Sequence, residues 1–458
     1  MENGENSATA EIPEEPEADQ ETIEIDFNLF FDGTLNNRTN IDQRLIAAEE
    51  LADQAERETA EELKKTMSPE QIEEVKAIYK KYGDEDSYGG AYSNVVKLEK
   101  YIKTDANSAE KLVLKSYIEG IGTVDKKGDK LRGYAIGTGS TGVEAKVTAG
   151  LREAAQEIEN NHHNKRAMIT TLTFNLFGFS RGAAAARHFI HEVLFSRPII
   201  EQLKALKYQV GEVKIGFVGL FDTVSSHGLS FSNDTGALNL DAISQAQNVV
   251  QLAAADEHRK NFSLTDIESA GGNGQEIFLP GVHSDIGAGY RDGEGESQVV
   301  LWASGIFIAL KKAKKERNRL IASNWYKAEE LNLISTPNSG VILQATRDSI
   351  SNRYSRIPLH IMADLARETE NKISFYGEIE KDEKTPPELE LAQQEIQAYV
   401  NQHKGKGTRT SEAVHWHDNG RTWLRDLRHG YFHFSAKLAF GHGPRYIGGQ
   451  RQRMTYVG

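Results

Sequence analysis

A serine between two glycines is the clearest chemical signal in the chain. Residues 178–182 read Gly-Phe-Ser-Arg-Gly, between the apolar run 169–177 and the alanine-rich stretch 183–194. In a nucleophile elbow the serine lies on a sharp turn from a strand into a helix, and the glycines leave room for the tightly folded backbone. The N–H groups that open the helix point at the place where an oxyanion forms. This context predicts that Ser180 is a nucleophile, against the alternative of an ordinary glycine-rich turn.

A serine nucleophile needs a histidine base and an acid that orients it, and in α/β-hydrolases the chain order is Ser, acid, His. Two later apolar runs end in suitable residues, since 213–221 leads into Asp222 and 276–279 leads into His283. The carboxyl ends of parallel strands share one edge of a sheet, so these residues are expected near Ser180. A helix N-cap is an equally good interpretation of Asp222, and a packed loop histidine is the alternative for His283.

Asp285 is the rival acid. If it completed the triad, the base would have to be a later histidine, and His360 and His433 are the best placed. The order Ser, Asp, His would still hold. This arrangement ranks second because residues i and i+2 at a turn commonly share one site, so that Asp285 can orient the loop without being the acid.

The oxyanion hole of such a site takes one N–H from the residue after the serine and one from a loop after an early strand. The first donor would be Arg181. The second would come from Gly33 or Thr34, which follow the strand-like run 23–31. A plain Asp-Gly turn is an equally good interpretation of that loop.

The proposed chemistry requires no cofactor and no metal, and we expect neither. The glycine-rich segment 137–142 lacks the Lys-Ser/Thr pair that a phosphate-binding loop needs after its last glycine. The histidine pairs His162-His163 and His415-x-His417 lie in polar stretches without the further ligands of a metal site.

Strand-like runs alternate with helical patterns through the first two-thirds of the chain. Strands are predicted at 23–31, 112–118, 169–177, 213–221 and 276–279, with an amphipathic helix at 143–160. Strands that are apolar throughout are typical of a sheet covered on both faces. The predicted class is therefore α/β, with an α/β-hydrolase-like, mostly parallel sheet flanked by helices. Helices are predicted at 297–319, 358–370 and 387–402.

We expect a single elaborated domain over residues 23–458. A helical insertion is predicted at 38–90, with two helices broken at Ser68-Pro69, and a mainly helical part at 296–458. Residues 1–22 are predicted to be a disordered acidic tail, because their composition cannot bury enough surface to offset ordering. Residues 1–26 hold ten acids and no Lys or Arg, so the rest of the chain carries −3 of the formal net charge of −13.

This composition excludes several function classes. A nearly neutral body lacks the positive field of a duplex-DNA binder, so nucleic acid is not an expected partner. The longest near-apolar run, 299–310, is too short to span a bilayer. The acidic N-terminus lacks the basic and apolar regions of a signal peptide. The chain has no cysteine, which excludes a disulfide, a thiolate metal site and a cysteine nucleophile.

A series of short motifs in a fixed order resembles the α/β-hydrolase domain of the first class of type VI secretion lipase effectors. The resemblance covers roughly residues 23–300. The motifs are Phe30-Phe31-Asp32-Gly33-Thr34-x-Asn36-Asn37, Ser93-Asn94-Val95, Gly122-Thr123, Gly137-x-Gly139, Gly178-Phe179-Ser180-Arg181-Gly182-Ala183, Gly219-x-Phe221-Asp222-Thr223-Val224, Asp256-Glu257-x-Arg259 and Pro280-Gly281-Val282-His283-Ser284-Asp285-Ile286-Gly287-x-Gly289-Tyr290.

The resemblance implies a phospholipase with Ser180 as nucleophile, Asp222 as acid and His283 as base. It also implies an antibacterial effector that is made in the cytoplasm, carried by a secretion spike protein into the periplasm of a target cell, and neutralised in the producer by an immunity protein. Ala288 departs from the family pattern, which has glycine there. A carboxylesterase or lipase that acts on neutral esters and a non-catalytic secretion adaptor are the alternative functions.

Overall fold

The computed structural model describes residues 21–51, 53–130, 139–225, 235–305, 308–337, 340–405, 407–410, 416, 421–438, 442–448 and 450–458. At its centre is a seven-stranded sheet with the order β11-β7-β5-β4-β3-β1-β2, in which all neighbouring strands are parallel. Its strands are β1 (Thr22–Phe31), β2 (Lys111–Ile118), β3 (Met168–Phe179), β4 (Val210–Phe221), β5 (Asn248–Ala254), β7 (Gly274–Leu279) and β11 (Thr408–Arg409).

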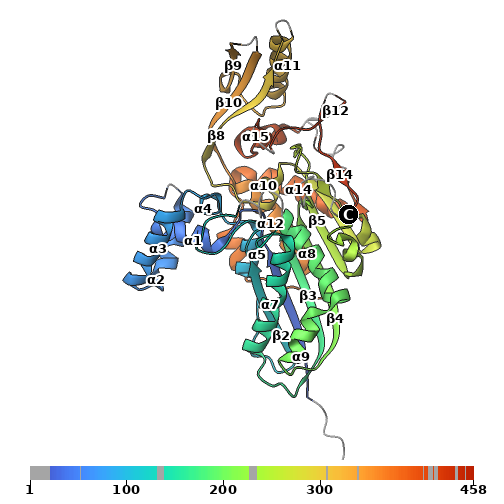
Figure 1. Cartoon of the computed structure of the whole chain (residues 1–458). Coiled ribbons are helices and arrows are strands. Elements are labelled where there is room, and N and C mark those ends of the chain that lie inside the picture. Colours follow the sequence, from blue (N-terminus) through green and yellow to red (C-terminus); the bar gives the residue numbers. More distant parts are fainter. Residues whose placement is uncertain are drawn as a thin grey trace, which may run out of the picture.

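Helices cover both faces of this sheet (Figure 1). One face packs against α7 (Val143–Asn161), α8 (Arg181–His191) and α9 (Pro198–Ala205), and the other against α5 (Asn94–Tyr101) and α12 (Arg356–Arg367). Each face has its own apolar core, because β1 sends Phe27 and Leu29 to the α8 side and Phe30 to the α12 side. The predicted α/β-hydrolase-like class is therefore confirmed, including strands that are apolar on both faces.

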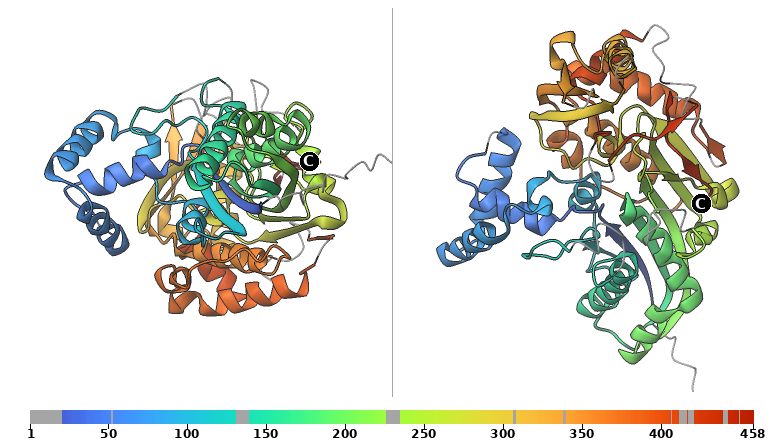
Figure 2. Two further views of the ribbon diagram at one scale, coloured as in Figure 1. Left: turned by 90° about the horizontal axis from the view of Figure 1, so that it is seen from below. Right: turned by 45° about the horizontal axis from the view of Figure 1, so that its top comes forward.

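The insertion after β1 is helical, and it stands out to one side of the sheet in both views of Figure 2. It contains α1 (Arg38–Ala47), α2 (Gln54–Lys65), α3 (Pro69–Tyr82) and the short α4 (Asp86–Gly89). The predicted break at Ser68-Pro69 is confirmed, because Ser68 caps α3 in a capping box with Gln71 and Pro69 opens the helix. A further break separates α1 from α2, where Asp53 is the N-cap.

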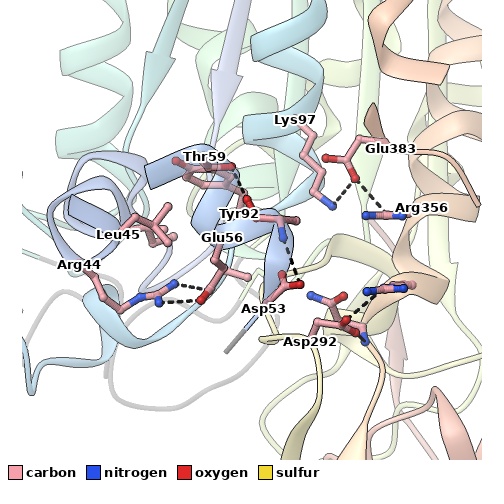
Figure 3. A pocket seen from close by; sticks show the side chains of 15 residues that line it. Arg44, Leu45, Asp53, Glu56, Thr59, Tyr92, Lys97, Asp292, Arg356 and Glu383 are labelled. Atoms are coloured by element: carbon pink, nitrogen blue, oxygen red, sulfur yellow. Dashed lines mark hydrogen bonds and ion pairs between the residues drawn. The ribbon is translucent and has the colours of Figure 1, made fainter. Parts of the chain in front are cut away.

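A small pocket of about 110 Å³ lies where this insertion meets the C-terminal part of the chain (Figure 3). Apart from Asp53, which caps α2, its charged side chains are paired with one another. The pairs are Arg44 with Glu56, Arg353 with Asp292, and Lys97 and Arg356 with Glu383. The pocket is therefore a polar contact region between two parts of the fold. Ser180, Asp222 and His283 do not line it.

The helix predicted at 297–319 is wrong over its first residues. Glu294–Ala303 is strand β8, which joins β10 (Gly340–Ile350) and β9 (Leu331–Thr336) in an antiparallel sheet, and only then does α11 (Ala309–Ala322) begin. Leu301 pairs with Leu343 and faces inward, whereas the next residue, Trp302, is exposed. A short apolar run fits a strand and a helix equally well, and pairing with β10 decides between them. The predicted helices at 358–370 and 387–402 correspond to α12 and α14 (Glu390–Gln402).

The end of the chain returns to the carboxyl edge of the main sheet. It passes through α13 (Glu378–Asp382), α14 and α15 (Thr422–Gly430), and then the short strands β12 (Tyr446–Ile447) and β13 (Gln450–Arg451). The last strand, β14 (Thr455–Tyr456), pairs in parallel with β6 (Leu264–Thr265). None of the helices in the described part of the chain is long and apolar enough to cross a bilayer. The expected acidic tail lies outside the described residues, apart from its last two positions.

Candidate active site

Ser180 stands on a sharp turn between β3 and α8. Its backbone has φ 58° and ψ −126°, a conformation that residues with a side chain rarely adopt. A Cβ atom on Gly178 would lie 2.5 Å from the Cα of Ala183, and one on Gly182 would lie 2.2 Å from the carbonyl oxygen of Asp32. Both glycines are therefore required by close backbone approach, as expected for a nucleophile elbow.

Replacing Gly182 with alanine is expected to damage both the fold and the activity. The new methyl group would overlap the backbone of the loop after β1, which cannot move away as a flexible side chain could. We expect a loss of about 1–3 kcal/mol in the free energy of unfolding, together with a lower rate of ester hydrolysis. Thermal unfolding and an ester assay measure the two effects. Gly377→Ala is the matched control, because its added Cβ would meet open space; equal effects of the two substitutions would contradict the prediction.

Asp222 and His283 come together at the carboxyl ends of their strands. The Nδ1 atom of His283 lies 2.5 Å from Oδ2 of Asp222, and both side chains are buried. Asp222 directly follows β4, and His283 opens the short helix α10 (His283–Gly287) just after β7. Asp222 accepts hydrogen bonds in this position from His283 and from the backbone N–H of Ala254, at 2.8 Å. It is not the cap of a helix.

The Asp222–His283 pair is adjacent to the elbow. The backbone N–H of Ser180 donates to the carbonyl of Phe221 at 3.0 Å, and Val224 donates back to the carbonyl of Ser180 at 3.3 Å. The ring of Phe179, the residue before the serine, packs against the His283 ring with centroids 4.7 Å apart. The acid loop and the histidine are thus both held against the turn that carries Ser180.

Two arginines balance the carboxylates around His283. Arg453 forms a double hydrogen bond with Asp222, at 2.6 and 2.8 Å, and Arg259 pairs with Glu257 at 2.8 Å. Glu257 in turn accepts from the backbone N–H of His283 at 3.3 Å. Burial alone would raise the pKa of Asp222, but Arg453 and His283 outweigh it and lower that pKa to about 2. Arg259 likewise holds the pKa of Glu257 well below its usual range despite burial.

His283 is expected to be neutral at neutral pH. Burial lowers its pKa below the ordinary value of 6.5, and the hydrogen bond to Asp222 opposes this only in part. A general base must be unprotonated, so the lowered pKa keeps it competent down to mildly acidic pH.

If His283 is the base, the acid limb of kcat/KM for a soluble ester is expected to have its midpoint below pH 6.5. The activity is lost as the pH falls through the lowered pKa of His283, because protonation removes the acceptor for the serine proton. A pH–rate profile from pH 4 to 8 measures this. A half-loss of kcat/KM above pH 6.5 would contradict the prediction.

Asp285 forms a second acid–histidine pair. Its Oδ1 atom lies 2.9 Å from Nδ1 of His433, and Tyr290 stacks on the His433 ring at 3.8 Å. Oδ2 of Asp285 accepts from the backbone N–H of Val282 at 2.9 Å, which holds the turn before His283. His360 lies elsewhere, with Nε2 2.7 Å from the carbonyl of Glu383. Of the two alternative bases for Asp285, the structure brings His433 to it and not His360.

The loop after β1 lies against the elbow. The Nε of Arg181 donates to the hydroxyl of Thr34 at 2.8 Å. The N–H of Gly33 donates to the carboxylate of Asp32 at 2.7 Å, and that carboxylate also accepts from the hydroxyl of Tyr117. Burial raises the pKa of Asp32 to about 6. Because the Gly33 N–H is already engaged, the arrangement favours the N–H groups of Arg181 and Thr34 as oxyanion donors.

Arg453 was not predicted as a site residue, although it contacts the predicted acid from 231 positions away. Glu257 and Arg259 lie within one of the sequence motifs, and no role was predicted for them. Among the described residues no group of three or more His, Cys, Asp and Glu side chains could hold a metal ion. The ring of His162 stacks on Tyr208 with centroids 5.4 Å apart. His415, His417 and Gly137 lie outside the described residues.

Comparisons with known proteins agree with the α/β-hydrolase-like class that the sheet and the elbow define. Residues 197–305 match the family model of the T6SS phospholipase effector Tle1-like catalytic domain. The predicted resemblance to type VI secretion lipase effectors is confirmed by this match.

Two solved structures are similar to the chain. The structure of the Tle1 effector bound to the VgrG spike from the type 6 secretion system is 22% identical, with a TM-score of 0.65 and 99% of each chain covered. The crystal structure of an uncharacterized protein from Pseudomonas aeruginosa is 17% identical, with a TM-score of 0.38 and coverage of 84% of this chain and 52% of that one. No curated protein sequence matches the chain. The first likeness shows that the two chains share a fold over nearly their whole length.

Proposed function

We propose that this protein is a serine esterase that hydrolyses acyl esters of glycerophospholipids through Ser180, His283 and Asp222. The observation that carries the proposal is the 2.5 Å contact between buried His283 and Asp222, packed against the elbow of Ser180. A serine on a strained strand-to-helix turn beside an acid–histidine pair is the arrangement of an acyl-transfer enzyme.

In the acylation step the Oγ of Ser180 attacks the ester carbonyl carbon while His283 takes the serine proton. Asp222 accepts from Nδ1 of His283 and so fixes the tautomer in which Nε2 is free to accept that proton. The backbone N–H groups of Arg181 and Thr34 would hold the developing oxyanion. His283 then gives the proton to the leaving alcohol, a lysophospholipid.

In the second step water attacks the acyl-enzyme, with His283 as the base. The proton returns to Ser180 as the fatty acid leaves. Asp222 stays ionised throughout, because Arg453 and His283 lower its pKa to about 2 despite its burial. The two carboxylates and two guanidiniums around His283 leave the resting cluster without net charge, so that the only new charge in the transition state is the imidazolium and its oxyanion partner.

The family match over residues 197–305 supports a phospholipase effector of the type VI system. The similar Tle1 structure is titled as a complex with a VgrG spike, and we propose that this chain is also carried by a spike protein. We further propose an antibacterial role in the periplasm of the target cell, with an immunity protein that protects the producer.

We also propose that residues 23–458 form one catalytic unit. Support comes from contacts that join the central part of the chain to its C-terminal part: Arg453 bonds to Asp222, His433 to Asp285, and Ser435 to Glu257. Because the C-terminal part contacts the loops of Asp222 and His283, a protein truncated at residue 296 is expected to lose ester hydrolysis.

The experiment that tests the proposal uses the purified full-length protein on two substrates. Hydrolysis of a short-chain p-nitrophenyl ester, lost in Ser180→Ala, establishes an esterase, and no hydrolysis would favour a non-catalytic adaptor. Release of fatty acid and lysophospholipid from vesicles separates a phospholipase from an esterase for neutral lipids. Activity on neutral esters with none on phospholipid vesicles would overturn the substrate assignment.

A further inference from the structure

Arg453, near the C-terminal end of the described chain, places its guanidinium group beside Asp222 in the candidate site. Arg453 is 2% exposed, and its two terminal nitrogens donate to the two carboxylate oxygens of Asp222 at 2.6 and 2.8 Å. The third nitrogen, Nε, donates to the carbonyl of Phe262 at 2.6 Å. Phe262 itself packs edge-on against the His283 ring with centroids 5.1 Å apart. Arg453 is therefore tied both to the proposed acid and to a residue that buttresses the proposed base.

These contacts fix the orientation of the carboxylate. Each oxygen of Asp222 takes two hydrogen bonds, Oδ1 from Arg453 and the N–H of Ala254, and Oδ2 from Arg453 and His283. A planar guanidinium binds a carboxylate in one plane. With that plane set, Oδ2 is aimed at Nδ1 of His283, so the ring is held in one rotamer.

Arg453 also balances the charge of the carboxylate that His283 contacts. The charged groups around the imidazole are Asp222, Glu257, Arg259 and Arg453, and the aromatic residues Phe179 and Phe262 cover its faces. His442 stands beyond Arg259, and burial together with that arginine lowers its pKa to about 4, so it is neutral. If Arg453 were absent, Asp222 would face His283 as an unbalanced anion, and protonation of the imidazole would become easier.

Arg453 is held in place by the residues that follow it, within the six-residue segment 453–458. We call these residues the C-terminal strap. Within it, Thr455 and Tyr456 form β14 on β6, and the N–H of Gly458 donates to the carboxylate of Asp266 at 3.0 Å. The strand β6 is in turn bonded to the acid loop, because Thr265 donates to the carbonyl of Thr223 at 3.0 Å. The strap is thus connected through β6 to the loop that carries Asp222.

We propose that Arg453 is a positioning residue of this site, that it acts on His283 through Asp222, and that the C-terminal strap is required for ester hydrolysis. This inference rests on the proposed esterase function. It extends that function by a residue and a segment that the Ser-Asp-His pattern does not contain.

The test compares Arg453→Gln, Arg453→Lys and the wild type in full-length protein, with kcat, KM and the pH profile measured on a soluble p-nitrophenyl ester. For Arg453→Gln we expect kcat to fall about tenfold or more and KM to stay unchanged, since Arg453 is buried and its guanidinium is bonded to Asp222 and Phe262. The midpoint of the acid limb is expected to rise by about one pH unit. Arg453→Lys keeps the positive charge, so its acid limb is expected to stay at the wild-type position while kcat recovers in part.

Arg347→Gln is the matched control. Arg347 is also a buried arginine, and it pairs with Glu296 at 2.7 Å away from His283. We expect this variant to melt earlier but to keep the wild-type acid limb. The inference would be overturned if Arg453→Gln had the kcat and the acid limb of the wild type. It would also be overturned if Arg347→Gln showed the same changes as Arg453→Gln.

Deletion of residues 455–458 gives the answer if Arg453→Gln does not fold. The deletion leaves Arg453 in the chain but removes β14, and we expect kcat to fall with KM unchanged. Wild-type kcat after the deletion would overturn the role of the strap. If the wild-type protein hydrolyses no ester at all, the proposed function fails first; an active wild type with unaffected Arg453 variants refutes only this inference.

Discussion

Ser180→Ala is expected to reduce kcat for ester hydrolysis by about 10⁶-fold, the scale on which triad enzymes lose activity without their nucleophile. The physical reason is that alanine lacks the Oγ atom that would form the bond to the acyl carbon. The loss should be the same on p-nitrophenyl esters and on phospholipid vesicles, because both pass through the same acyl-enzyme. Initial rates under identical conditions measure it.

The fold of the variant is expected to remain intact. Ser180 already adopts φ 58°, and alanine has the same need for that conformation, so the strain is not changed. Ser263→Ala is the matched control, because Ser263 is also a buried serine and its hydroxyl has no partner among the described residues. Wild-type activity in Ser180→Ala, with contamination excluded, would remove Ser180 from the mechanism, and an equal loss in Ser263→Ala would point to unfolding.

The sequence predicted the strands that carry the site well, for a physical reason. Runs such as 169–177 and 213–221 are apolar on both faces, which is typical of a strand in a sheet that is covered on both sides, and the structure extends them as β3 and β4. Asp222 and His283 could be paired from sequence because each follows such a strand. Parallel strands bring their carboxyl ends to one edge, even though the two residues are 61 positions apart.

Other parts could not be predicted in this way. The strand β5 was not predicted, although its last residue, Ala254, donates its backbone N–H to Asp222. The start of α11 was placed too early, because residues 297–303 have the composition of a strand and of a helix alike, and the partner strand β10 lies about forty residues later in the sequence. Tertiary pairing decides such cases.

Arg453 illustrates a different limit. It stands in a C-terminal stretch of arginines and glycines with no periodicity, and its partner is 231 residues away. Local patterns carry no information about a contact of that range. What fixes it is the return of the chain to the sheet edge through β14.

The two acids near His283 differ in what surrounds them. Asp222 is paired with Arg453 and lies 2.5 Å from His283, whereas burial raises the pKa of Asp285, which is paired with His433. Only the histidine of the first pair packs on Phe179, next to Ser180. The geometry therefore favours Asp222 as the triad acid. Asp285 instead stabilises the turn at Val282, from whose backbone N–H it accepts a hydrogen bond.

Asp222→Asn is accordingly expected to lower kcat by about 10⁴-fold, because an amide can stabilise the wrong imidazole tautomer. The substitution also leaves Arg453 buried without its anion, which costs about 3–5 kcal/mol of stability, so the rates must be compared below the melting temperature of the variant. Asp285→Asn is the matched control, since it also removes a buried carboxylate that bonds to the Nδ1 atom of a histidine. Its effect on kcat should be far milder. If Asp285→Asn proves the more damaging of the two, and His433→Ala is as inactive as Ser180→Ala, then the second pair is the catalytic one. In that case the contact between Asp222 and His283 would serve only to hold the acid loop against the elbow.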